Sequence, residues 1–136
     1  MSTTVKTILI TGSTDGIGRL AAKKLVDLGH NVIIHGRNQQ RIQATLADLK
    51  CSEAVAGDLS NLAQVETMVD TIKSKYSKID VLINNGGVLK AEHTVNENGW
   101  DVRFVVNTVA PFLLTKRLLS LISKSSGRVI NVSSAA

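Results

Sequence analysis

The segment TGSTDGIG, residues 11–18, combines residue types that can bind a phosphate. Its glycines, Gly12, Gly16 and Gly18, separate a short apolar run from an amphipathic stretch of helical length. Glycine adopts the positive φ of a tight turn and lets the backbone approach a ligand closely. A helix that begins directly after the turn offers unpaired N–H groups and the positive end of its dipole. The pattern predicts a turn that binds the pyrophosphate of a dinucleotide.

A second candidate is Arg37, in the segment HGRN at residues 35–38, where another apolar run ends. In dinucleotide-binding folds this position reads the adenosine ribose: a carboxylate favours a free 2′-hydroxyl, and an arginine accommodates a 2′-phosphate. The segment has no carboxylate, and the planar guanidinium of an arginine suits phosphate oxygens. Arg37 therefore favours NADP(H) over NAD(H) as the cofactor, with simple solvation of the next helix as the alternative role.

Asn107 stands inside a strongly apolar stretch of helical length, where an unpaired amide would be costly. Pro111, four residues later, has no N–H, so the Asn107 carbonyl loses its helical partner and we expect a kink. Two interpretations remain open. Asn107 is either a satisfied core amide that ties the helix to the sheet, or part of a buried site that holds a water.

The chain ends on GRVINVSSAA, residues 127–136, where an apolar run leads to two hydroxyl side chains, Ser133 and Ser134. Side chains alternate along a strand, so only one of the two is expected to face a ligand. Taken alone, these residues favour the simpler interpretation, in which both hydroxyls satisfy the end of a strand.

Five short apolar runs must position these candidates. They alternate with amphipathic stretches of helical length, which is typical of β-α-β units around a parallel sheet. The expected strands are 7–10, 31–34, 54–56, 81–83 and 128–132. We expect an α/β fold: a Rossmann-like, doubly wound parallel sheet of five strands with helices on both faces. No linker or repeat interrupts it, so residues 1–136 form one dinucleotide-binding domain.

Four helices are expected between the strands. The first carries an apolar stripe from Ile17 to Leu28. Asn38 is placed to cap the second helix, and the third begins near residues 60–61. The fourth, about 98–124, is apolar around most of its circumference. A helix of that kind needs a partner besides its own sheet, so we expect a subunit contact there.

Composition narrows the class of protein. The chain has 136 residues, 43% hydrophobic and 20% charged, as expected for one globular domain. The N-terminal apolar run, residues 8–10, is too short for a signal peptide, and charged and polar residues interrupt the longest apolar region, so we expect neither a signal peptide nor a membrane partner. The net charge is +5, but lysine and arginine are scattered, which argues against a nucleic-acid partner. The single cysteine, Cys51, favours a cytoplasmic location without a disulfide or a Cys-rich metal site; no metal site is expected.

These motifs, in this order, resemble the short-chain dehydrogenase/reductase family. The turn has that family's Gly-x-x-x-Gly-x-Gly spacing, and four further matches follow: GDLS at 57–60, NNGG at 84–87, Asn107, and NVSS at 131–134. The resemblance covers residues 5–136. It implies an oxidoreductase that transfers a hydride between the nicotinamide of NADP(H) and a small carbonyl or alcohol substrate.

The resemblance also implies roles for single residues. Ser134 matches the family's catalytic serine, and Asn107 matches the asparagine that helps to hold a water in a proton relay. Asp58 and Leu59 would meet the adenine, and residues 85–87 would line the adenosine side. The implied cofactor-binding residues are Gly12, Ser13, Thr14, Asp15, Gly16, Ile17, Gly18, Arg37, Asp58, Leu59, Asn85, Gly86 and Gly87.

The family's proton-transferring Tyr-x-x-x-Lys pair, which lies downstream of the serine, is missing from this sequence. The one tyrosine, Tyr76, has Asp80 at the lysine position and lies on the apolar stripe of the third helix. Family members are usually nearly twice this length. We therefore expect the NADP(H)-binding portion of a short-chain oxidoreductase, lacking the C-terminal part of the family fold and inactive alone.

Two other functions fit the same residues. One is a non-catalytic NADP(H)-binding sensor or regulatory module that never carried the catalytic pair. The other is a structural interaction protein that docks through its long apolar helix. A homo-oligomer that forms through the 98–124 helix or the open edge of the last strand is compatible with all three functions.

Overall fold

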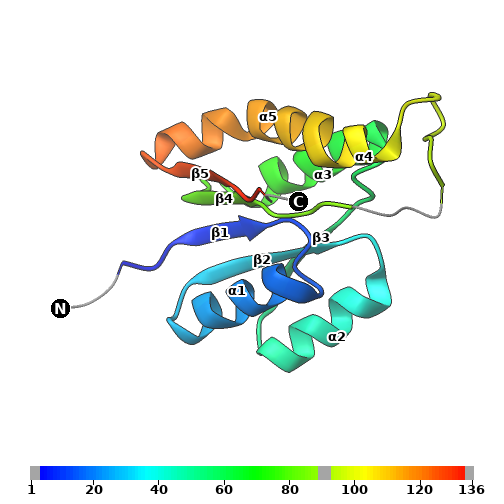
Figure 1. Ribbon diagram of the computed structural model, residues 1–136. Helices are drawn as coiled ribbons and strands as arrows, with labels where there is room; N and C mark the ends of the chain where they lie inside the picture. Colours follow the sequence, from blue (N-terminus) through cyan, green and yellow to red (C-terminus); the bar gives the residue numbers. More distant parts are fainter. Residues whose placement is uncertain (1–3, 89–92, 134–136) are drawn as a thin grey trace.

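The computed structural model describes residues 4–88 and 93–133 and shows a parallel sheet between two layers of helices (Figure 1). The sheet has five strands in the order β3-β2-β1-β4-β5, and every pairing is parallel. The strands are β1 (Thr7–Ile10), β2 (Asn31–Gly36), β3 (Glu53–Ala56), β4 (Val81–Asn84) and β5 (Arg128–Asn131). The expected fold class and strand positions are confirmed.

The helices are divided between the two faces of the sheet. On one face lie α1 (Gly16–Asp27) and α2 (Gln39–Leu49); on the other lie α3 (Leu62–Lys75), α4 (Val102–Phe104) and α5 (Ala110–Lys124) (Figure 1). Alternate residues of β1 serve two separate cores. Leu9 packs with α3 and α5, whereas Ile8 and Ile10 pack with α1 and α2. The continuous apolar runs of β1, β2 and β4 are the result of burial on both faces of the sheet, whereas β5 is mostly exposed.

Helix ends follow the expected capping chemistry. The Asn38 side chain accepts the N–H of Arg41 at the start of α2, and Asn61 accepts the N–H of Gln64 at the start of α3. Gly29, just beyond α1, has a φ of +93°, the left-handed conformation that ends a helix.

The predicted apolar stripe of α1 is wrong at both ends. Ile17 is 73% exposed and Leu28 is 67% exposed, whereas Gly18 and Ala22 are the buried residues of this helix. The rotation of α1 is set by Gly18, because a Cβ there would collide with the carbonyl oxygen of Gly12 and the amide of Asn85. With Gly18 turned inward, Ile17 must face outward.

The fourth predicted helix starts later than expected, at Val102, with Asp101 as its cap. The Asp101 carboxylate accepts the backbone N–H groups of Arg103 and Phe104. Hydrogen bonding to the Arg103 side chain is the main reason why the pKa of Asp101 falls to about 2. In place of a simple kink before Pro111, the helix has a π-helical turn, Val105–Val109, in which the Ala110 N–H bonds to the Val105 carbonyl. A π-helical turn is one way for a helix to absorb a disrupted hydrogen-bond ladder.

The stretch Val102–Lys124 is also long and apolar enough to cross a bilayer by composition, with a mean hydropathy of 1.4. A core helix of a globular domain passes the same test, and here Ala110, Leu114 and Leu118 are fully buried.

Candidate cofactor site

The candidate site lies at the carboxyl edge of the sheet, where the strand order reverses between β1 and β4. A groove of about 1160 Å³ opens there. It brings together five of the residues predicted for the site, although they come from three separate parts of the chain. They are Ile17 on α1, Asn85, Gly86 and Gly87 after β4, and Asn107 on the π-helical turn. Ser133 also lines the groove, and Ser134 lies outside the described residues.

The glycine turn has the geometry that its sequence predicts. Gly12 and Gly16 have φ values of +63° and +60°, and Gly18 allows α1 to approach the Gly12 carbonyl. The turn is held from β4 by Asn85, whose side-chain N–H groups donate to the carbonyls of Thr11 and Gly12 at 3.2 and 3.1 Å. The hydroxyl of Thr11 also joins the two segments, because it accepts hydrogen bonds from the N–H groups of Asn85 and Gly86.

His35 is a residue that holds the glycine turn and that the sequence analysis missed. It is 3% exposed at the end of β2, and its Nδ1 accepts the Gly12 N–H at 2.9 Å. Its Nε2 lies 2.9 Å from the Gly57 carbonyl and donates to it as the neutral tautomer. Burial lowers the pKa of His35, in spite of the Gly57 carbonyl and the Asp58 carboxylate. The sequence did contain a signal for this role, because His35 is a polar residue at the end of the apolar run NVIIHG, residues 31–36.

The N-terminus of α1 follows the turn directly, and its first two residues, Gly16 and Ile17, are exposed. The first N–H groups of any helix lack intrahelical partners, and Asp15, at the N-cap position, makes no side-chain capping hydrogen bond. Instead, the Asp15 carboxylate pairs with the Arg41 guanidinium of α2 at 2.8 Å. This end of α1 is therefore open to an anion.

The end of β2 packs directly against the turn. A Cβ on Gly36 would lie 2.7 Å from the Thr14 methyl group, so Arg37 follows at the border of the turn, where it is exposed. After β3, the Asp58 carboxylate accepts both the N–H and the hydroxyl of Ser60. Leu59 is 8% exposed and packs beside Gly86, where a Cβ would lie 2.7 Å from it.

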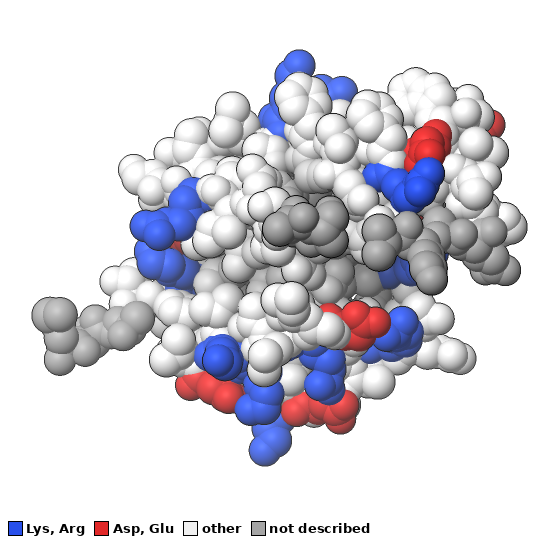
Figure 2. All heavy atoms as spheres, viewed as in Figure 1, with Lys and Arg blue, Asp and Glu red and all other residues white. Residues whose placement is uncertain are grey.

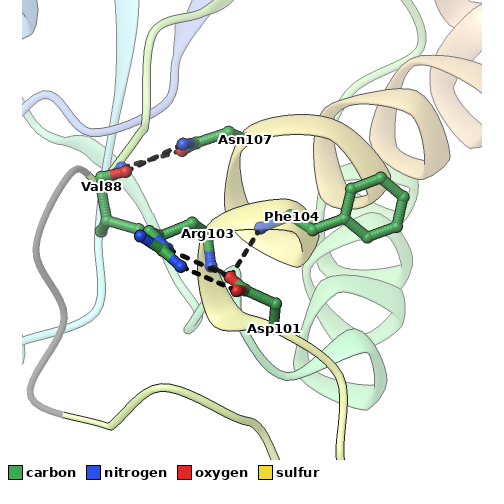
Figure 3. Close-up of polar contacts among 5 residues, drawn as sticks. All are labelled: Val88, Asp101, Arg103, Phe104 and Asn107. Atoms are coloured by element: carbon green, nitrogen blue, oxygen red, sulfur yellow. Dashed lines mark hydrogen bonds and ion pairs between the residues drawn. The ribbon is translucent and has the colours of Figure 1, made fainter.

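Asn107 is exposed, so the predicted buried site is wrong. Its amide is nevertheless satisfied, because Oδ1 accepts the Val88 N–H and Nδ2 donates to the Val88 carbonyl, both at 2.8 Å. Figure 3 shows this two-bond contact, with Arg103 and Asp101 paired beside it and the Phe104 ring pointing away. Asn107 thus ties the helix to the segment that follows β4. Gly87 leaves room for it, since a Cβ there would lie 3.2 Å from Oδ1.

Asn84 closes the floor of the groove. Its Nδ2 donates to the Thr115 hydroxyl at 3.0 Å and to Asn131 Oδ1 at 2.9 Å, which joins β4 to α5 and β5. Its Oδ1 is buried and has no hydrogen-bond partner among the described residues.

Tyr76 does not line this groove. Its hydroxyl donates to Glu53 at 2.6 Å, and burial, together with that carboxylate, raises the pKa of Tyr76 well above its usual range. It is therefore a structural tyrosine that links α3 to β3.

The sheet order and the glycine turn define a Rossmann-type fold. A family model described as short chain dehydrogenase matches residues 6–136, so this chain belongs to that family. Human retinol dehydrogenase 13 is 33% identical over 96% of this chain and 42% of its own length. The NADP-dependent 3-hydroxy acid dehydrogenase YdfG of Salmonella typhi is 31% identical over 95% of this chain and 54% of its own length. The chain thus spans about half the length of these curated relatives.

Solved structures agree with the fold. A short chain dehydrogenase from Shigella flexneri complexed with NADP has a TM-score of 0.82 at 28% identity, covering 96% of this chain and 59% of that one. A metagenomic short-chain oxidoreductase in complex with NADP has a TM-score of 0.83 at 29% identity, covering 100% of this chain and 65% of that one.

Proposed function

We propose that this chain is the NADP(H)-binding portion of a short-chain oxidoreductase, which transfers a hydride between the nicotinamide and a small carbonyl or alcohol substrate. The observation that carries the proposal is the open N-terminus of α1 beside a glycine turn held in place by Asn85 and His35. An anionic pyrophosphate fits this end of a helix. The NADP complexes of similar proteins support the same cofactor.

Arg37 gives the preference for the 2′-phosphate. No carboxylate follows β2 in the segment HGRN, and Arg37 forms no ion pair with any residue of 4–88 or 93–133. Its guanidinium is therefore available to phosphate oxygens, which it can bind in a bidentate manner. The remaining turn residues, together with Asp58, Leu59 and residues 85–87, would surround the adenosine half of the cofactor.

Calorimetric titration with NADPH and NADH tests the cofactor. We expect NADPH to bind more tightly, and Arg37→Gln to weaken NADPH by about tenfold, because a hydrogen bond to a charged group is lost. NADH affinity should hardly change. Arg128→Gln, the same charge change at the exposed start of β5, is the control. Equal affinity of the wild-type chain for both cofactors would remove the role of Arg37, and binding of neither would remove the proposed function.

We further propose that the chain alone has negligible turnover. Ser134 would help to position the substrate, and Asn107 would hold the segment after β4 at the edge of the same groove, but the sequence holds no Tyr-x-x-x-Lys pair. Positioned acid–base catalysis is worth about 10²–10⁴-fold in rate. NADPH oxidation with a panel of small aldehydes and ketones measures this directly. A rate comparable to that of an intact reductase would contradict the proposal.

The sequence of the natural gene beyond the Ala136 codon distinguishes an oxidoreductase from a sensor or regulatory module. An open reading frame that continues past the Ala136 codon into Tyr-x-x-x-Lys supports the oxidoreductase and the catalytic roles of Ser134 and Asn107. A stop codon directly after Ala136 supports a dinucleotide-binding sensor, in which the two serines are ordinary hydroxyls at a strand end.

A further inference from the structure

The ion pair between Asp15 and Arg41 joins the start of α1 to the first turn of α2, two helices that lie side by side on one face of the sheet (Figure 1). The two charged groups are 2.8 Å apart, and their side chains are 72% and 56% exposed. In Figure 2 the surface over α1 and α2 carries basic and acidic side chains next to each other, whereas the surface over α5 is mostly uncharged. A pair this exposed contributes little to stability. Its position at the N-terminus of α1 is what points to a role.

Asp15 occupies a place where its carboxylate would normally bond to the helix. Aspartate is among the best N-cap residues, because its side chain accepts N–H groups of the first turn. Asp15 has the extended backbone of an N-cap, with φ −155° and ψ 174°, yet makes no side-chain capping bond. Asn38 and Asn61, the N-cap residues of α2 and α3, both make theirs. What distinguishes Asp15 is that Arg41 holds its carboxylate.

We propose that Arg41 is a positioning residue that withholds the Asp15 carboxylate from the N-terminus of α1 and so keeps those N–H groups available to the cofactor pyrophosphate. The inference rests on the proposed NADP(H) function. Without Arg41, Asp15 would cap the helix, occupy the donors that a phosphate needs and place an uncompensated negative charge beside it. Arg41 acts through Asp15 and needs no contact with the cofactor.

A double-mutant cycle on cofactor affinity tests this inference. Arg41→Gln should weaken NADPH and NADH by the same factor, about fivefold to tenfold, because the pyrophosphate is common to both and the carboxylate would compete for the same donors. Asp15→Ala removes the competing carboxylate without losing a capping bond, and its own affinity for each cofactor sets the reference for the second half of the cycle. In the Asp15→Ala background, Arg41→Gln should have almost no effect.

Thermal unfolding of the free protein gives a second readout with the opposite sign. Arg41→Gln should leave the melting temperature unchanged or raise it, since α1 gains a cap, while cofactor affinity falls. A merely structural ion pair would lower both. The matched control is Lys23→Gln, which breaks the Lys23–Asp27 pair of 2.9 Å at the other end of α1 with the same charge change and should leave affinity unaltered.

Three results would overturn the inference. The first is a loss of NADPH affinity alone that Asp15→Ala does not rescue, which would make Arg41 a direct ligand of the 2′-phosphate. The second is an Arg41→Gln affinity no lower than that of Lys23→Gln. In both of these cases wild-type binding of NADPH, and its sensitivity to Arg37→Gln, still support the proposed function. The third is absence of NADPH binding by the wild-type chain, which removes the function and the inference together.

Discussion

At the scale of single residues, His35 shows how a buried polar group can fix a binding turn. The imidazole connects the Gly12 N–H to the Gly57 carbonyl, and only the neutral ring can accept from one and donate to the other. Protonation would place the Nδ1–H of the ring against the N–H of Gly12, so this hydrogen bond would be lost. The lowered pKa of His35 favours the neutral ring, which is the form that can make both hydrogen bonds.

The stability of the fold should accordingly depend on pH through His35. Because burial holds the folded-state pKa of His35 below the unfolded value of about 6.5, protonation favours unfolding. Stability is full above about pH 6.5 and decreases below it, by up to about 1.4 kcal/mol per pH unit. Urea denaturation between about pH 8 and pH 5, a range set around that ordinary pKa, measures this loss.

Two variants isolate the contribution of His35. His35→Gln keeps one acceptor and one donor but does not titrate, so its stability should lack this pH-dependent decrease. His35→Leu leaves the Gly12 N–H and the Gly57 carbonyl unpaired and should lose about 2–3 kcal/mol at about pH 8. His93→Gln, at an exposed position, should behave as the wild type. An unaltered pH profile in His35→Gln would contradict the argument.

At the scale of elements, the sequence predicted strands better than helix rotations. Short apolar runs mark β1 to β5, although β5 itself is mostly exposed, and the Gly-x-x-x-Gly-x-Gly spacing located the turn. The predicted apolar stripe of α1 was wrong because a count of apolar residues ignores Gly18. This glycine packs against the Gly12 carbonyl and the Asn85 amide and so sets the rotation of the helix. Asn107 was expected in the core for a related reason: its apolar neighbours Phe104 and Phe112 are themselves 56% and 66% exposed.

Two glycines of the same turn should differ in their tolerance of alanine. Gly16 has a positive φ, but a methyl group added there would meet nothing within 4 Å, so Gly16→Ala should cost only the conformational strain of about 1–2 kcal/mol. Gly18→Ala meets the Gly12 carbonyl and the Asn85 amide and should cost about 3 kcal/mol or more. Chemical denaturation of both variants gives the comparison. Equal losses would show that α1 can shift away from the turn.

At the scale of the whole molecule, apolar side chains remain exposed on the long helix and on the last strand. Phe112 and Leu119 are 66% and 54% exposed, and Ile130 and Val132 are 41% and 48% exposed. β5 is also the edge of the sheet. Exposed apolar residues beside an open strand favour association.

We therefore expect self-association at high protein concentration, detectable by light scattering. Phe112→Glu or Leu119→Glu should shift the protein toward the monomer if the helix forms the contact, because each places a charge in an apolar interface. Gln43→Glu, at an exposed position on α2, is the control. A monomer at all concentrations would contradict the expected subunit contact.

The anchoring of the glycine turn has a consequence for hydrogen exchange. The N–H groups of Thr11, Gly12 and Ser13 are bonded to the Ile83 carbonyl, to the His35 ring and to the His35 carbonyl, respectively. Three consecutive loop amides are thus tied to the central strands, and they can exchange with deuterium only when β2 or β4 separates from the turn. They should exchange as slowly as the amides of β1, so the loop and the sheet open as one cooperative unit.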